Sequence, residues 1–252
     1  MEAYLRTVMP RLGLCWGLVA CRLGVWRLSG GSLEALAEEC QALAAVVWGL
    51  EPEDFQRATN CPPWTLQELV VHIASSIRVG QRPPTAPLGA APREAADYYR
   101  RPERDTAAYR QGNIDRTREQ TRAVLAQMTA AQWLEQTIRA TMATLGVEDP
   151  DRVVVIDRVG PMRMADWVVT RVVSVAAHGL DVALTLSRPP WTTPAALVVI
   201  EPVLVSLLRT RPPGQLGWDQ LDLLQTGTGR RALTSTECQH LGSLADRFPL
   251  LS

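Results

Sequence analysis

Apolar residues return every three or four positions along most of this chain, the spacing that places them on one face of an α-helix. In the segment 33–50, for example, they include Leu36, Cys40, Leu43 and Val47. The same periodicity predicts helices over residues 33–50, 66–79, 104–128, 130–145, 165–186, 194–208 and 236–247. We therefore expect a mainly α protein.

Local signals set the ends and the continuity of these helices. Thr65 and Glu68 form a T-x-x-E capping box at the start of the helix at 66–79, in which each side chain accepts a hydrogen bond from the backbone of the other residue. Gly112 predicts an interruption in the helix at 104–128, because glycine is a poor helix former.

The remaining segments divide the chain into three parts. Residues 1–31 form an N-terminal extension, residues 32–190 a helical bundle, and residues 191–252 a small C-terminal domain. Short apolar runs predict strands at 153–156 and at 221–225. The C-terminal part is therefore expected to be a small mixed α/β segment.

The N-terminal extension holds an apolar run at 12–21, between Arg11 and Arg22. This run is too short to span a hydrocarbon layer of about 30 Å. Glu2 and the lack of a small-residue cleavage motif argue against a signal peptide. We therefore expect an additional amphipathic helix there, a cytoplasmic protein and no membrane partner.

Composition narrows the classes of function. The 26 basic and 26 acidic residues balance, so no net field favours nucleic acid as a partner. No basic residue is a lysine, which excludes a Schiff-base lysine and a P-loop lysine. The five cysteines include no C-x-x-C pair, which favours reduced thiols over a disulfide framework. The expected partner is a small-molecule substrate, and an oligomer is compatible with the sequence.

One polar stripe crosses the otherwise apolar helix at 165–186. Its members recur at spacings of three and four residues, which places them on one helical face: Arg171, Ser174, His178, Asp181 and Thr185. Buried polar groups must be hydrogen-bonded to one another or face a cavity. Two interpretations stay open, namely a structural network that includes Arg171, His178 and Asp181, or a polar cavity.

A second histidine with apolar neighbours lies in the helix at 66–79. His72 follows three apolar residues, and taken alone it would be a core residue with satisfied hydrogen bonds. Because His178 also lies in an apolar helix, the two residues favour an inward-facing pair across the bundle. His240 lies in a polar segment and is expected at the surface.

Two stretches of the chain resemble the signatures of a known family. Residues 61–74, CPPWTLQELVVHIA, and residues 160–183, GPMRMADWVVTRVVSVAAHGLDVA, are similar to motifs of the mycothiol-dependent maleylpyruvate isomerase and DinB-like superfamily. The resemblance implies a DinB-like four-helix bundle with a divalent metal, typically zinc, held by one histidine and a later Glu-x-x-x-His pair. His72 and His178 would then be metal ligands, whereas Ser174 stands where the family has the glutamate.

The resemblance also implies a reaction. Mycothiol or a similar thiol would bind the metal as a thiolate and attack a small electrophilic metabolite, as an isomerase or an S-transferase requires. In that setting Arg171 is expected to orient a substrate carboxylate. Asp181 is expected to fix the tautomer of His178 or to pair with Arg171.

Two alternatives stay open because Ser174 replaces a charged ligand. A metal-free member of the family would use Ser174 and Asp181, with His72 and His178, for acid–base chemistry on a small molecule of specialised metabolism. A non-catalytic member would only bind a small molecule. A serine hydrolase is disfavoured, since no G-x-S-x-G elbow surrounds Ser174.

Overall fold

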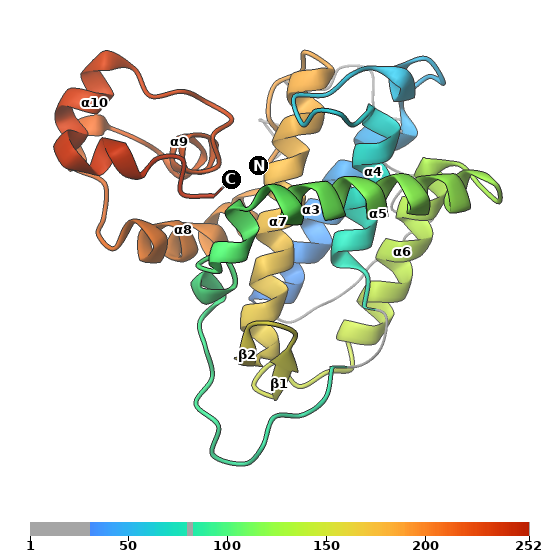
Figure 1. Cartoon of the computed structure of the whole chain (residues 1–252), viewed down its shortest axis with the longest axis horizontal. Coiled ribbons are helices and arrows are strands. Elements are labelled where there is room, and N and C mark those ends of the chain that lie inside the picture. The colour runs from blue at the N-terminus through green and yellow to red at the C-terminus, as the bar shows by residue number, and fades with distance from the viewer. Residues whose placement is uncertain (1–30, 80–82, 252) are drawn as a thin grey trace.

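Four helices form the core of the protein in this computed structural model, which describes residues 31–79 and 83–251. They pack against one another as a bundle and are α3 (Ser32–Trp48), α4 (Leu66–Ile77), α6 (Ala130–Leu145) and α7 (Met164–Thr185) (Figure 1). A fifth helix, α5 (Ala107–Leu125), crosses in front of them and contacts α4 and α6 (Figure 1). The mainly α bundle is confirmed, and the helix predicted at 12–21 lies outside the described residues.

The capping box at the start of α4 is confirmed, but the interruption of α5 is not. Thr65 Oγ1 accepts from the backbone N–H of Glu68 at 3.4 Å, and Glu68 Oε2 accepts from that of Thr65 at 2.9 Å. Helix α5 begins at the cap Thr106 and runs without a break through Gly112. The prediction at Gly112 was wrong because one glycine inside a helix costs only about 1 kcal/mol, which a long and capped helix tolerates.

A β-hairpin leads into the central helix. Strand β1 (Val153–Ile156) pairs antiparallel with β2 (Gly160–Arg163), and Val153 lies opposite Arg163. The strand predicted at 153–156 is therefore confirmed. Since β2 ends where α7 begins, the hairpin fixes the start of α7.

Helix α7 is the element around which the others pack. It contacts α3, α4 and α8 (Pro194–Leu208), and Val172, Val175 and Val182 are fully buried in it. Among the described residues it is the one helix long and apolar enough to cross a membrane, but 72% of its apolar window is buried inside the protein. Packing within the core therefore accounts for its apolar sequence.

The C-terminal part contains helices and connecting loops, and no strand among its described residues. Its helices are α8, α9 (Gln220–Gly227), α10 (Ser235–Leu241) and the two 3₁₀ helices η4 (Gly214–Leu216) and η5 (Gly242–Arg247). The strand predicted at 221–225 was wrong, and with it the β portion of this segment. Asp219 caps α9 by accepting from the backbone N–H of Asp222 at 2.8 Å, which favours helix over strand.

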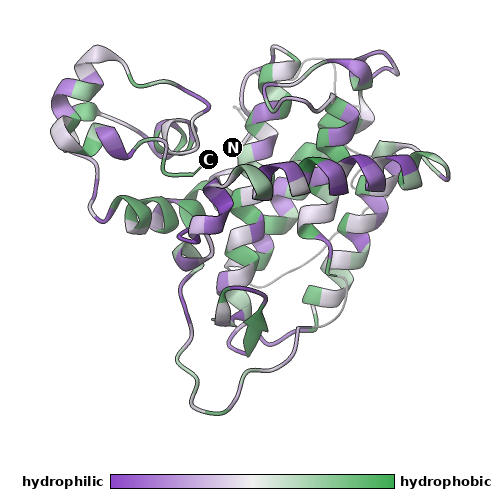
Figure 2. Ribbon diagram, viewed as in Figure 1, coloured by the Kyte–Doolittle hydropathy of each residue, from purple (hydrophilic) through white to green (hydrophobic). Residues whose placement is uncertain are grey.

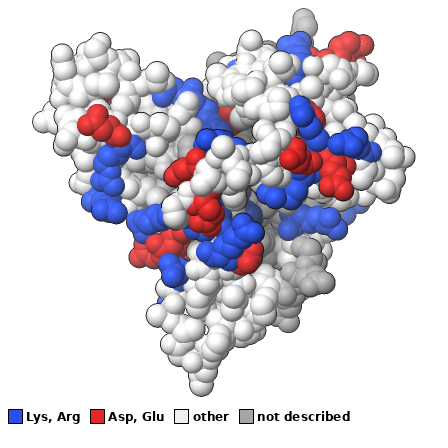
Figure 3. Space-filling model, viewed as in Figure 1, with Lys and Arg blue, Asp and Glu red and all other residues white. Residues whose placement is uncertain are grey.

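The hydropathy of the residues differs strongly between these elements. Helix α5 is hydrophilic along most of its length, whereas α8 is largely hydrophobic (Figure 2). On the face shown in Figure 3, basic and acidic side chains are interspersed across the middle of the molecule. This face therefore carries no broad surface of one sign.

Candidate functional site

Helices α4 and α7 bring the two predicted histidines together inside the bundle. The ring centroids of His72 and His178 lie 5.1 Å apart, and the rings are nearly perpendicular at 87°. Both side chains line the same cavity. The inward-facing pair expected from the sequence is therefore present, whereas His240 is exposed, as expected.

His72 is fixed by contacts on two sides. Its Nδ1 lies 3.2 Å from Thr117 Oγ1 of α5, and the ring of Trp64 packs against it with centroids 4.4 Å apart. Burial, followed by the neighbouring His178, lowers the pKa of His72 to about 3. His72 is therefore a neutral imidazole at neutral pH.

His178 is oriented by a buried carboxylate three residues further along α7. Its Nδ1 lies 2.9 Å from Asp181 Oδ2, and Asp181 is fully buried. An ionised carboxylate only accepts hydrogen bonds, so Nδ1 carries the proton of the neutral ring. The other ring nitrogen, Nε2, is left with a free lone pair for a ligand in the cavity.

Asp181 is kept ionised by several donors from outside α7. Arg230 binds it through two nitrogens, with Nε 2.9 Å from Oδ1 and Nη2 2.6 Å from Oδ2. Asn60 Nδ2 donates to Oδ1 at 2.8 Å, and Cys61 Sγ donates to Oδ2 at 3.1 Å. Burial by itself raises the pKa of Asp181, but hydrogen bonds from His178 and Arg230 and their charges hold it below its usual range.

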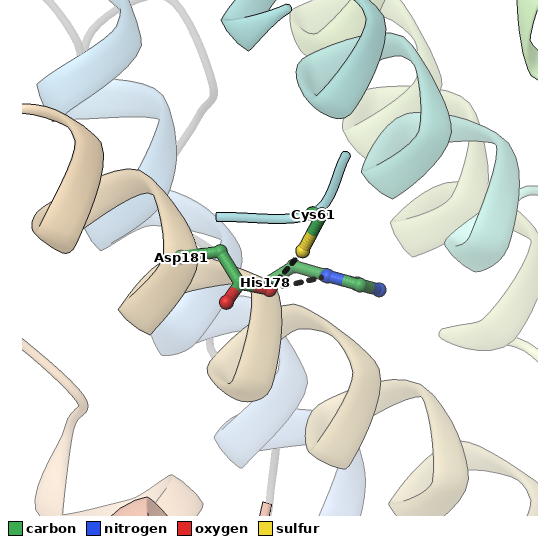
Figure 4. A group of neighbouring side chains, drawn as sticks. All are labelled: Cys61, His178 and Asp181. Carbon is green, nitrogen blue, oxygen red and sulfur yellow. Dashed lines mark hydrogen bonds and ion pairs between the residues drawn. The ribbon is translucent and has the colours of Figure 1, made fainter. Parts of the chain in front are cut away.

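The thiol of Cys61 is a donor in this network rather than a nucleophile. Burial and then the negative charge of Asp181 raise the pKa of Cys61 to about 12. Figure 4 shows the cysteine and the histidine meeting at the carboxylate. Cys61 is therefore protonated at neutral pH.

The cavity has a volume of about 340 Å³ and follows the polar face of α7. Arg171, Ser174 and His178 line it from α7, and Tyr109 and Arg116 are among the residues that line it from α5. Arg230 comes from the C-terminal part. Helix α4 and the segment 98–104 also contribute to its wall, so several regions that are distant in sequence line one cavity.

Three arginines in the cavity wall lack a carboxylate partner among the described residues, namely Arg104, Arg116 and Arg171. Arg171 is only 9% exposed, and its guanidinium donates to Ser76 O at 2.8 Å. It does not pair with Asp181, which corrects that part of the expected network; the partner of Asp181 is Arg230 instead. Guanidinium groups without a carboxylate partner favour an anionic ligand in the cavity that they line.

Residues 36–183 match the family model described as the mycothiol maleylpyruvate isomerase N-terminal domain, which is more than half of the 252 residues. The chain belongs to this family. A search of the curated proteins and a search of the solved structures each gave no match. The family domain contains both histidines and the polar stripe as far as Asp181, whereas Arg230 lies beyond it.

The resemblance to this family implies a divalent metal, and one group of side chains near Asp181 has its ligand atoms close enough together to hold such an ion. Ligand atoms of Cys61, His178 and Asp181 lie within 4.8 Å of one another, which is compatible with a divalent cation. The charges do not favour one, because Arg230 already neutralises Asp181 and the Cys61 thiol is protonated. A cation here would lie beside a guanidinium of the same sign.

The family's own ligand arrangement is also incomplete. His72 and His178 supply two neutral nitrogens, but Ser174 supplies no carboxylate. Ser174 Oγ donates to Ser76 Oγ at 3.0 Å. Neither position thus has the net negative charge that stabilises a bound cation, because Arg230 offsets Asp181 at one and Ser174 replaces a carboxylate at the other. These residues do not fit a metal well, and we assign no reaction step to one.

Several cavity residues gave no signal in the sequence. The wall formed by α5 was missed because that helix is polar on nearly every side, so its cavity face does not stand out. Tyr98 and Tyr99 lie in the 3₁₀ helix η2 (Ala95–Tyr98) and directly after it, in a segment without periodicity. Arg230 is one arginine among 26 basic residues. Because it lies 49 residues from Asp181 in sequence, no local pattern predicts the contact between them.

Proposed function

We propose that this protein is a thiol-dependent isomerase or S-transferase that acts in the cytoplasm on a small, anionic, electrophilic metabolite. The thiol is mycothiol or a similar low-molecular-weight thiol. The observation that carries the proposal is the contact of buried Asp181 with His178, at 2.9 Å, beside a cavity whose wall holds arginines without a carboxylate partner among the described residues. Membership of the family supports the thiol as co-substrate.

The reaction begins with proton transfer to His178. Its Nε2 accepts the proton of the bound thiol, and ionised Asp181 stabilises the imidazolium that forms. The guanidinium of Arg171 holds the anionic group of the substrate and orients the electrophilic carbon. The thiolate then attacks that carbon and either leaves again after rotation about the former double bond or remains as an S-conjugate.

A second candidate function uses the same pair without a thiol. His178 would then take a proton from carbon or oxygen of the substrate itself, as a general base. The free Nε2 of His178 favours this candidate as much as the first. The requirement for a thiol separates the two.

The test is turnover of maleylpyruvate and related small anionic electrophiles by the purified protein, with and without mycothiol. We expect conversion only with the thiol, and a loss of about 10²–10⁴-fold in rate for His178→Ala. The control is His240→Ala, which changes an exposed histidine and should keep the rate of the parent. Conversion without a thiol would instead support the second candidate.

The same preparation decides the role of a metal. We expect full activity after treatment with a chelator and sub-stoichiometric zinc by elemental analysis. Loss of activity on chelation and recovery with zinc would assign thiol activation to a metal instead of His178. The protein would be a non-catalytic binder if it turned over none of these substrates, and if His72→Ala and His178→Ala left its binding of them unchanged.

A further inference from the structure

One tyrosine of the cavity wall is surrounded by positive charge. The ring of Tyr98 has the guanidinium carbons of Arg101, Arg171 and Arg104 at 4.5, 4.8 and 5.4 Å from its centroid. Arg101 also lies 3.8 Å from Glu103, but Arg104 and Arg171 have no carboxylate partner among the described residues. The phenol of Tyr98 therefore lies in a concentrated positive field.

The other two tyrosines of this wall differ from Tyr98. The hydroxyl of Tyr99 donates to the backbone carbonyl of Thr170 at 2.9 Å, and burial raises the pKa of Tyr99 above its usual range. Tyr109 accepts a hydrogen bond from Arg104 at 3.3 Å. Tyr99 thus has a structural partner in the backbone, whereas the ring of Tyr98 packs against that of Tyr99 and has three guanidinium groups around it.

The positive field changes the acidity of Tyr98. Burial alone raises its pKa, but the charge and hydrogen bonding of Arg171, followed by the charges of Arg104 and Arg101, lower it to about 8. A proton donor is most effective when its pKa lies near the working pH. Tyr98 is mostly protonated at neutral pH and can release its proton easily.

The position of Tyr98 suits a role opposite His178. Arg171, against which Tyr98 packs, precedes His178 by seven residues on α7, which corresponds to about 10 Å along the helix axis. Both residues line one cavity. A small metabolite and the sulfur of a thiol together span such a length.

We propose that Tyr98 is a catalytic residue of the reaction described above and donates its proton to the substrate oxygen that becomes negative as the thiolate adds. The sulfur–carbon bond forms, the electrons of the double bond move to the carbonyl oxygen, and that oxygen takes the proton of Tyr98. In the reverse step Tyr98 takes the proton back, the double bond forms again, and the sulfur–carbon bond breaks. This inference rests on the proposed function.

The first test needs no turnover. The ionisation of phenols is followed by ultraviolet difference absorbance as the pH is raised, for the parent protein, Tyr98→Phe and Tyr99→Phe. We expect one tyrosine of the parent to ionise near pH 8. That transition should vanish in Tyr98→Phe and remain in Tyr99→Phe. Identical titration curves for the parent and Tyr98→Phe would overturn the inference.

The second test is the pH dependence of thiol-dependent turnover. In the parent the rate should fall as the pH rises through about 8, because the donor loses its proton. Tyr98→Phe should lower kcat by about 100-fold with a smaller change in KM, and should remove this alkaline limb. Tyr99→Phe should lower the melting temperature but keep the limb.

The outcomes separate the two proposals. If the parent shows no thiol-dependent turnover, the proposed function fails and the assignment of Tyr98 as its proton donor fails with it, whatever the titration shows. If the parent turns over and Tyr98→Phe keeps both its rate and its pH profile, the inference alone fails. Melting curves of both variants establish that each is folded.

Discussion

Replacement of Asp181 by asparagine tests the ion pair at the centre of the site. The carboxylate is fully buried and accepts hydrogen bonds from His178, Arg230, Asn60 and Cys61. Asparagine keeps the size of the side chain but removes its charge. Its amide N–H group also faces donors that need an acceptor, so the network cannot reform with the same partners.

The expected loss of stability follows from the partner that remains. Removal of one member of a buried ion pair costs about 3–5 kcal/mol, because the other charge is left uncompensated. Arg230 is that member, and its side chain is only 16% exposed. We therefore expect Asp181→Asn to lower the free energy of unfolding by about 3–5 kcal/mol, measured by urea denaturation at neutral pH.

A matched control is Asp246→Asn, which changes an exposed carboxylate of η5. Surface substitutions of this kind change stability by no more than about 0.5 kcal/mol. An effect of the same size in both variants would mean that loss of charge in general, and not the buried pair, lowers stability. A loss below about 1 kcal/mol for Asp181→Asn would refute the reasoning about the pair.

The pH dependence of stability provides a second check. The pKa of Asp181 in the folded protein lies below its usual range, because donors outweigh burial. Such a group stabilises the fold above its unfolded pKa of about 3.9, and this contribution is lost as the pH falls towards the folded value. The stability difference between the parent and Asp181→Asn should therefore narrow below about pH 4. A difference that stays constant down to lower pH contradicts the assignment.

Three further predictions concern a cap, a buried acid and the missing ligand. Thr65→Ala should lower the free energy of unfolding by about 1 kcal/mol in urea, and an unchanged value would mean that the capping box of α4 contributes nothing. Burial raises the pKa of Glu39 to about 7, despite a hydrogen bond from the backbone N–H of Thr193, so its ionisation destabilises the fold as the pH rises towards 7. Glu39→Gln should remove this loss, so above pH 7 its free energy of unfolding should exceed that of the parent by on the order of 3 kcal/mol. If the free energies of unfolding of the two proteins change with pH in parallel, this prediction is wrong. Ser174→Glu should raise zinc affinity in isothermal titration, since it adds a carboxylate one helical turn before His178, and equal affinity would show that the cavity rejects the cation for another reason.

The elements that could be predicted from the sequence are those with contrast between apolar and polar positions. Polar side chains stand out on α7 because nearly all other positions of that helix are apolar, and the same contrast identified His72 on α4. The strand at 153–156 could be predicted because it is a run of β-branched residues, whereas its partner β2 was not predicted, since Gly160 and Pro161 indicate a turn. Helix α9 was taken for a strand because five residues are too few to distinguish the two periods.

The partners of Asp181 could not be predicted because they come from distant parts of the chain. Asn60 and Arg230 are 121 and 49 residues away from it in sequence, one in the segment before α4 and the other in the C-terminal part. Arginine is common in this chain, so neither composition nor spacing singles out Arg230. The polar stripe thus predicted the position of a site, but not that Arg230 balances the charge of Asp181.

The balance of charge in the cavity explains how the two differences from the family pattern act together. Ser174 removes a negative charge that the family places beside the histidines, and Arg230 cancels the charge of Asp181. Arg116 and Arg171 then leave the cavity wall positive. A positive cavity opposes a divalent cation, and in the proposed reaction it would stabilise a thiolate and an anionic substrate. Fixed guanidinium groups can therefore lower the pKa of a bound thiol in place of a metal, with His178 as the acceptor of its proton.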